Sequence, residues 1–141
     1  MAAKDKFHQI VKSALINDGW KITHDPYEIR QKGLISRSLE IDLGAERIIG
    51  AEKGTEKIAV EIKSLISESI IYEFHAVLGQ YLNYQVALEI IEPNRTLFVA
   101  IPEFGHKKLL KEGLTQIVIN RFKIKLIIFD SENQNIVKWE M

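Results

Sequence analysis

The chain has 141 residues, of which 46% are hydrophobic, so we expect one domain over residues 1–141 with a buried core. Its 19 basic and 19 acidic residues cancel, so net charge gives no support for nucleic-acid binding, and any such site must arise from local charge. The lack of cysteine excludes disulfides, thiolate zinc sites and a thiol nucleophile. Without an apolar signal core or an apolar run of membrane-spanning length, we expect a cytoplasmic protein with no membrane partner.

The N-terminal part predicts a helix followed by a short strand. Residues 4–18 predict the helix, because their apolar side chains recur with helical spacing. This stripe consists of Phe7, Ile10, Val11, Ala14 and Leu15. Residues 20–24 predict a short strand that ends at Asp25-Pro26. Residues 25–38 are polar and predict irregular structure.

Two stretches near the middle of the chain predict β-strands that carry charge. In residues 39–43 (LEIDL), apolar and acidic residues alternate, which is typical of a strand. Residues 46–53 predict a second strand, weakened by Gly50, and residues 53–56 predict a turn. Residues 57–64 (KIAVEIKS) predict the next strand.

The second half of the chain alternates helices with buried strands. The expected elements are a helix at 70–91, a strand at 95–101, a helical stretch at 104–122 that breaks near Gly113, a strand at 124–130 and an edge strand at 136–140. Strands separated by helices favour parallel pairing in a sheet that is covered on both faces. We therefore predict an α/β fold with a central mixed β-sheet flanked by helices.

The charged residues in the two middle strands predict a metal site. Side chains two apart on a strand share a face, so Glu61 lies beside Lys63, and Glu40 lies beside Asp42. If the two strands pair, Asp42 and Glu61 converge, and two close carboxylates need a cation or a proton between them. Mg²⁺, with Mn²⁺ as a substitute, suits such a pair, because Mg²⁺ takes one or two carboxylates and completes its shell with water and phosphate.

Lys63 would then stabilise negative charge that develops on a phosphodiester, or orient the attacking water. Asp42, Glu61 and Lys63 are thus the predicted catalytic residues, and Asp42 and Glu61 are the predicted metal ligands. The alternative is that Glu-x-Lys lies on a solvated face as an ion pair worth about 0–1 kcal/mol.

The helix at 70–91 supplies further candidates. Gln80 and Tyr84 lie four residues apart on one face, with Glu73 on the same side. The Gln80 amide and the Tyr84 hydroxyl are predicted to contact DNA phosphate oxygens or to orient the metal-site groups, and Glu40 is a weaker addition.

This pattern resembles the PD-(D/E)xK nuclease superfamily. Asp42 matches its first acid, Glu61-Ile62-Lys63 match its second half, and QYLNY resembles the Q-x-x-x-Y motif of its exonuclease branch. The resemblance implies a restriction-endonuclease-like fold. The chain departs from the pattern at Ile41, where the motif has proline, and in the 18 residues between Asp42 and Glu61. The extra acid or histidine of the first helix has only Asp5 and His8 as candidates.

The whole chain is also similar to the XisH family, the fdxN-element excision controlling factors of cyanobacteria. The similarity extends from MAAKDKFHQIVKSAL through SLEIDLGAERIIGAEKG and VEIKS to VALEIIEPNRTLFVAIP and VKWEM. It implies an accessory role in site-specific excision of a DNA element during heterocyst differentiation. The implied partners are DNA, the companion excision factor XisI and a second copy of the chain in a homo-oligomer. The alternative is a non-catalytic regulatory or scaffold subunit that binds XisI and the recombination complex.

Other candidate features lie outside this pattern. The basic stretch of residues 107–125 faces either DNA phosphates or solvent. Trp20 and Trp139 are predicted to pack in or near the core, with Trp139 at an interface. His75 and His106 have no ligand-spaced partner, so neither is assigned a metal role.

Overall fold

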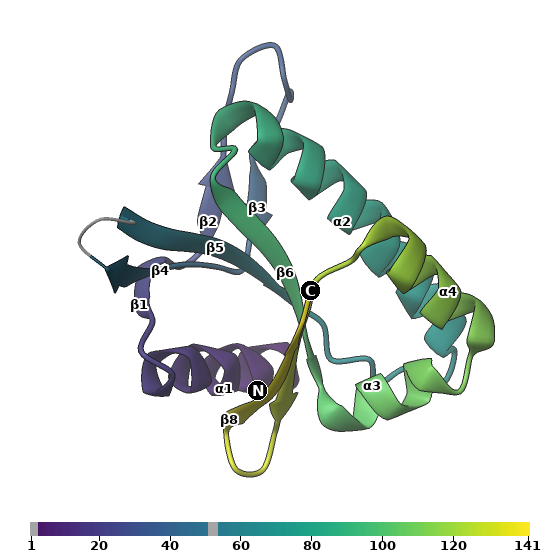
Figure 1. Ribbon diagram of the computed structural model, residues 1–141. Coiled ribbons are helices and arrows are strands. Elements are labelled where there is room, and N and C mark those ends of the chain that lie inside the picture. The colour runs from purple at the N-terminus through teal and green to yellow at the C-terminus, as the bar shows by residue number, and fades with distance from the viewer. Residues whose placement is uncertain (1–2, 51–53) are drawn as a thin grey trace.

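The computed structural model of the chain describes residues 3–50 and 54–141 (Figure 1). Its elements, in chain order, are α1 (Ala3–Asn17), β1 (Lys21–His24), β2 (Tyr27–Ile29), β3 (Leu39–Ile41), β4 (Leu43–Gly50), β5 (Gly54–Ile62), α2 (Ile70–Ile91), β6 (Arg95–Pro102), α3 (Glu103–Leu110), α4 (Gly113–Phe122), β7 (Leu126–Asp130) and β8 (Asn135–Glu140). The long helix has the predicted bounds, and the strands of the second half lie within two residues of theirs.

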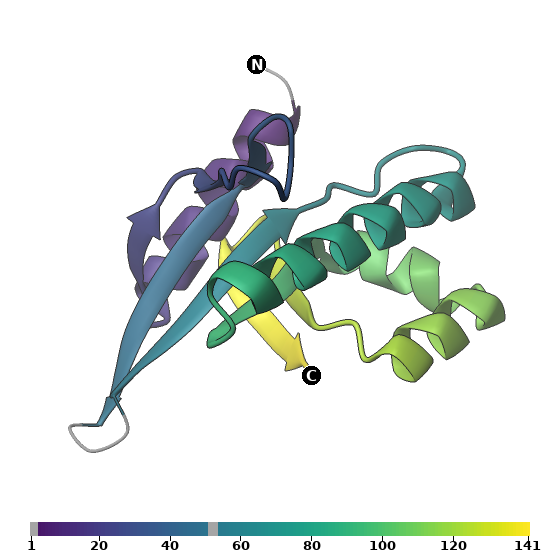
Figure 2. The ribbon, with the colours of Figure 1, turned by 90° about the horizontal axis from the view of Figure 1, so that it is seen from above.

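Six strands form the central sheet, in the order β1-β4-β5-β6-β7-β8. β5, β6 and β7 run parallel, because helices connect them, whereas β1, β4 and β8 are antiparallel to their neighbours. Helix α1 covers one face, and α2 covers the other together with α3 and α4 (Figures 1 and 2). The predicted α/β fold with a central mixed sheet flanked by helices is confirmed.

The core consists of one apolar layer on each face of the sheet. The α1 face is filled by the predicted helical stripe and by strand residues such as Val60 and Phe98. The α2 face buries Ala59, Leu97 and Tyr81. Because successive strand residues point to opposite faces, Glu61 follows Val60 onto the α2 face. The acidic residue of β5 is therefore placed under α2.

The prediction of a single strand at residues 39–43 is wrong. The chain forms β3 as far as Ile41, bends at Asp42, and enters the central sheet with Leu43. β3 pairs instead with β2 in a separate two-stranded sheet, which lies beside the end of α2 that leads into β6 (Figure 1). The apolar and polar alternation continues through the bend, so the pattern alone gives no sign of it.

Two neighbouring predictions also need correction. Residues 27–29 form β2 rather than irregular structure, because Tyr27 and Ile29 are both buried against the core. The turn predicted at residues 53–56 is replaced by the start of β5 from Gly54 onward, and Lys53 lies outside the described residues. The second predicted strand starts three residues earlier, at Leu43, and its residues 51–53 lie outside the described part.

Candidate functional site

Two hydrogen bonds tie Asp42 to the end of β5, one to the Glu61 carboxylate and one from the Ile62 backbone. The backbone N–H of Ile62 donates to Asp42 Oδ2 over 2.8 Å, and the backbone N–H of Asp42 donates to Glu61 Oε1 over 3.3 Å. The last backbone pair between β4 and β5 is Leu43 with Val60. Beyond this pair, the Asp42 and Glu61 carboxylates accept the hydrogen bonds of backbone N–H groups on the opposite segment. The two acids are therefore held next to each other at the end of the β4–β5 pairing.

Glu61 is a buried carboxyl, with 8% of its surface exposed. Burial is the main reason that its pKa rises from the ordinary 4.5 to about 7, and the negative charge of Asp42 adds to the rise. The Lys63 ammonium lies 3.3 Å from Glu61 Oε2 and partly offsets both effects. The pair Glu61–Lys63 is therefore a partly buried ion pair at a cavity, rather than one on a solvated strand face.

All six predicted site residues line one cavity of about 340 Å³ at the carboxyl end of β5. They are Glu40, Asp42, Glu61, Lys63, Gln80 and Tyr84. Ser64 also lines the cavity, and sequence reasoning missed it; its position next to Lys63 is the only signal that could have indicated it. The segments around β3, β4 and β5 supply Glu40, Asp42, Glu61 and Lys63, and α2 supplies Gln80, Tyr84 and one more acid, Glu73.

The two α2 residues differ in how they are used. The Tyr84 hydroxyl donates to the backbone oxygen of Glu40 over 3.3 Å, which fixes the ring beside the acids. Burial raises the pKa of Tyr84 to about 12, with the charges of Glu61, Asp42 and Glu40 as further causes, so the hydroxyl stays a donor. The Gln80 Oε1 atom is buried and has no hydrogen-bond partner among the described residues.

Other residues of the cavity wall, and the candidates from the first helix, lie as follows. Phe7 and Pro26 line it, and Glu73 lines it while accepting a hydrogen bond from the backbone N–H of Ser67. His8, a candidate from the first helix, binds Asp25 instead, with 2.7 Å between Nε2 and Oδ1. Asp5 belongs to α1, but its side chain lies outside the part of the chain whose side chains are described.

The composition of the site fits a hard divalent cation. Two adjacent carboxylates and an unpartnered Gln80 oxygen are oxygen ligands, which Mg²⁺ prefers. Among the described residues, no three His, Cys, Asp or Glu side chains gather in a way that would hold a metal ion. A cation held here would therefore keep much of its shell as water or phosphate oxygen, which is the usual behaviour of Mg²⁺.

The basic stretch of residues 107–125 does not line the acidic cavity. Lys108 lies over the Phe104 ring at 5.8 Å, and Lys125 lines a different cavity.

Within the described residues, no helix has the length and apolar character needed to cross a membrane.

A family model for the XisH protein matches residues 1–137. The chain belongs to the XisH family. An XisH family protein from Nostoc punctiforme PCC 73102 has a crystal structure with 39% identity and a TM-score of 0.83, which covers 97% of this chain and 100% of its own. A fdxN element excision controlling factor protein from Anabaena variabilis matches with 37% identity and a TM-score of 0.83, over 97% of this chain and 99% of its own. A search of curated proteins gives no match.

Proposed function

We propose that this XisH protein acts in the excision of a DNA element through a metal-dependent site of the PD-(D/E)xK type. The observation that carries the proposal is the interlocked pair of Asp42 and Glu61, with the Lys63 ammonium 3.3 Å from Glu61, in one cavity. The sequence similarity to an excision controlling factor supports the DNA-element context. The restriction-endonuclease-like resemblance of the motif supports phosphodiester chemistry.

The roles follow from the chemistry of each group. Asp42 and Glu61 would hold Mg²⁺ or Mn²⁺, which when bound activates water and neutralises charge on a phosphodiester. Lys63 places a positive charge beside Glu61, where it stabilises negative charge that develops on the phosphate. Tyr84 orients the segment that carries Asp42 through its bond to Glu40, and the unpartnered Gln80 oxygen would accept a hydrogen bond from a water molecule.

The protonation of Glu61 links this site to pH. With a pKa of about 7, the carboxyl holds a proton in roughly half of the molecules at neutral pH when no cation is present. A cation that binds both acids must displace this proton, so its affinity falls as the pH falls below about 7. Cutting should therefore be favoured on the alkaline side of neutrality.

Cleavage of single-stranded, duplex and branched DNA in Mg²⁺ and in Mn²⁺ tests the proposal. We expect Lys63→Met to lower the cleavage rate by about 10²–10³, because a charge that stabilises the transition state is lost. Lys57→Met is the matched control, since Lys57 lies on β5, the strand that leads to Lys63, but outside the cavity, and pairs with Glu92. Circular dichroism verifies both folds. If the wild type cuts none of the substrates, alone or with XisI, or if both variants cut equally, the nuclease proposal fails.

The alternative function is a non-catalytic subunit that binds XisI and the recombination complex. Three apolar residues of α2 favour it, because Leu82, Val86 and Ile90 are 46%, 55% and 53% exposed and recur every four residues on one helix face. The substitution Val86→Lys should then abolish co-elution with XisI, whereas Glu89→Lys, on the same helix, should not. Co-elution that survives Val86→Lys would contradict this role of the stripe.

A further inference from the structure

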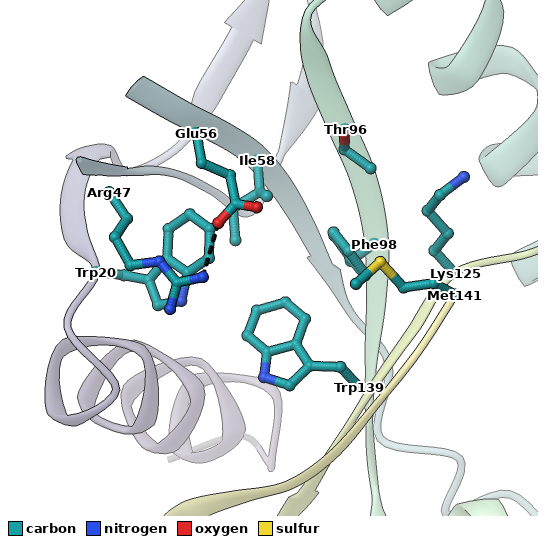
Figure 3. A pocket seen from close by; sticks show the side chains of 9 residues that line it. All are labelled: Trp20, Arg47, Glu56, Ile58, Thr96, Phe98, Lys125, Trp139 and Met141. Carbon is teal, nitrogen blue, oxygen red and sulfur yellow. Dashed lines mark hydrogen bonds and ion pairs between the residues drawn. The ribbon is translucent and has the colours of Figure 1, made fainter. Parts of the chain in front are cut away.

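A second cavity, of about 400 Å³, lies on the α1 face of the sheet (Figure 3). The acidic cavity includes Glu61 and Lys63, at the carboxyl end of β5, whereas this one includes Glu56 and Ile58, nearer the start of that strand. Its apolar lining includes Ile58 and Phe98, which are 1% and 3% exposed. The two cavities therefore lie toward opposite ends of β5.

Aromatic rings form one side of this second cavity. The Trp20 and Trp139 ring centroids are 5.7 Å apart, and Trp139 meets Phe98 edge-on at 5.1 Å. The Arg47 guanidinium lies over the Trp20 ring at 4.7 Å and is held by Glu56 at 2.9 Å, so one face of Trp20 is already occupied. Trp139 packs against Trp20 and Phe98 but stays half-buried, whereas Trp20 is buried, so Trp139 is the ring whose remaining surface a ligand can reach.

The side-chain charges around the cavity leave one cation unpaired. Arg47 and Glu56 neutralise each other, whereas Lys125 has no acidic side chain within 4.0 Å among the described residues. In Figure 3 the Trp139 ring lies between the Trp20–Arg47 side and the Lys125 side of the cavity. The Thr96 side chain adds a hydroxyl on the Lys125 side. The cavity thus combines an aromatic surface with one free positive charge.

We propose that this cavity binds a nucleotide, with the base stacked on Trp139 and the phosphate held by Lys125. Its volume lies in the range of about 300–1,000 Å³ that is usual for small-ligand sites. Stacking on an aromatic ring tolerates every base, so the cavity should accept purines and pyrimidines. The nucleotide is either free or one unit of a single strand, because both present the same base and phosphate. The proposal does not depend on the acidic site.

The chain offers a selective probe, because its only two tryptophans, Trp20 and Trp139, both line this cavity. Adenosine monophosphate and a short thymidylate oligonucleotide are titrated into the protein, and the two indole N–H signals are followed by NMR. We expect the Trp139 signal to shift and tryptophan fluorescence to be quenched. Lys125→Ala should weaken binding about tenfold, since a charged phosphate contact is lost. The control Lys107→Ala, an exposed lysine of α3, should leave the affinity unchanged.

The outcomes separate the alternatives. A shift with the mononucleotide supports a site for free nucleotides, and a shift with the oligonucleotide alone supports a site for one unit of a single strand. If neither probe moves the indole signals, or if Lys125→Ala binds as tightly as the wild type, the proposal is overturned. The indole signals distinguish the two cavities, because neither tryptophan lines the acidic one.

Discussion

The raised pKa of Glu61 makes the stability of the protein depend on pH in a defined window. The folded state binds the Glu61 proton more tightly than the unfolded chain does, because the carboxyl is buried beside Asp42. Its contribution is therefore fully present below pH 4.5 and is lost as the pH rises through about 7. The interval from 4.5 to about 7, at about 1.4 kcal/mol per pH unit, corresponds to about 3 kcal/mol of unfolding free energy.

The substitution Glu61→Gln removes this titration while keeping the size of the side chain and an oxygen that accepts the Asp42 N–H. Near pH 5, the protonated wild type resembles the variant, and their free energies of unfolding should lie within about 1 kcal/mol of each other. Near pH 8, the variant should be more stable by up to about 3 kcal/mol, a figure that already includes the ion pair with Lys63.

Urea unfolding without metal, followed by tryptophan fluorescence at several pH values, measures this difference. Glu89→Gln is the control, because Glu89 is exposed on α2 and should leave the pH dependence of the wild type unchanged. Identical pH dependences for the wild type and Glu61→Gln between about pH 5 and 8 would refute the reasoning, since they would show that Glu61 titrates as it does in the unfolded chain.

Two further substitutions test the packing that supports the site. Arg95 is buried, donates to Glu92 over 2.7 Å and lies over the Tyr27 ring. Arg95→Met should therefore lower the free energy of unfolding in urea by about 3 kcal/mol. A loss below about 1 kcal/mol would contradict a structural role for these contacts. Tyr84→Phe removes the hydrogen bond to the Glu40 backbone and should lower the free energy of unfolding by about 1 kcal/mol. Tyr72→Phe, which changes an exposed ring of the same helix, should not lower it measurably. Equal Tm values for the two variants would contradict the assigned bond.

The elements that the sequence predicted well have clear local signals, such as a long apolar run or a proline that marks an end. Helix α2 has the predicted bounds, since a long apolar-rich stretch is followed closely by Pro93. β6 was predicted from its continuous apolar run, and its burial on both faces is confirmed. By contrast, Asp42 sits in an unbroken alternation, and where the chain bends its carboxylate accepts a hydrogen bond from Ile62, twenty residues away. No local pattern contains that partner.

In the candidate site, too, some features follow from local sequence spacing and others depend on tertiary packing. The spacing of Glu61 and Lys63 places both at one end of β5, and the structure brings Asp42 beside them. Their roles as metal ligands and catalytic cation stay predictions. The buried, unpartnered Gln80 oxygen depends on tertiary packing and could not be read from the helix pattern. Lys125 was grouped with a basic stretch, yet it lines a cavity with Trp20 and Trp139, because β7 and β8 are neighbours in the sheet.

Calorimetric titration of Mn²⁺ and of Mg²⁺ into the metal-free protein tests the metal site most directly. We expect one ion per chain, with a heat that depends on the buffer near pH 7, because binding releases the proton that Glu61 holds there. Glu61→Gln should lose both the binding and the proton release, whereas Glu89→Gln should retain them. Absence of binding in the wild type, or an unchanged affinity in Glu61→Gln, would contradict a metal site at Asp42 and Glu61.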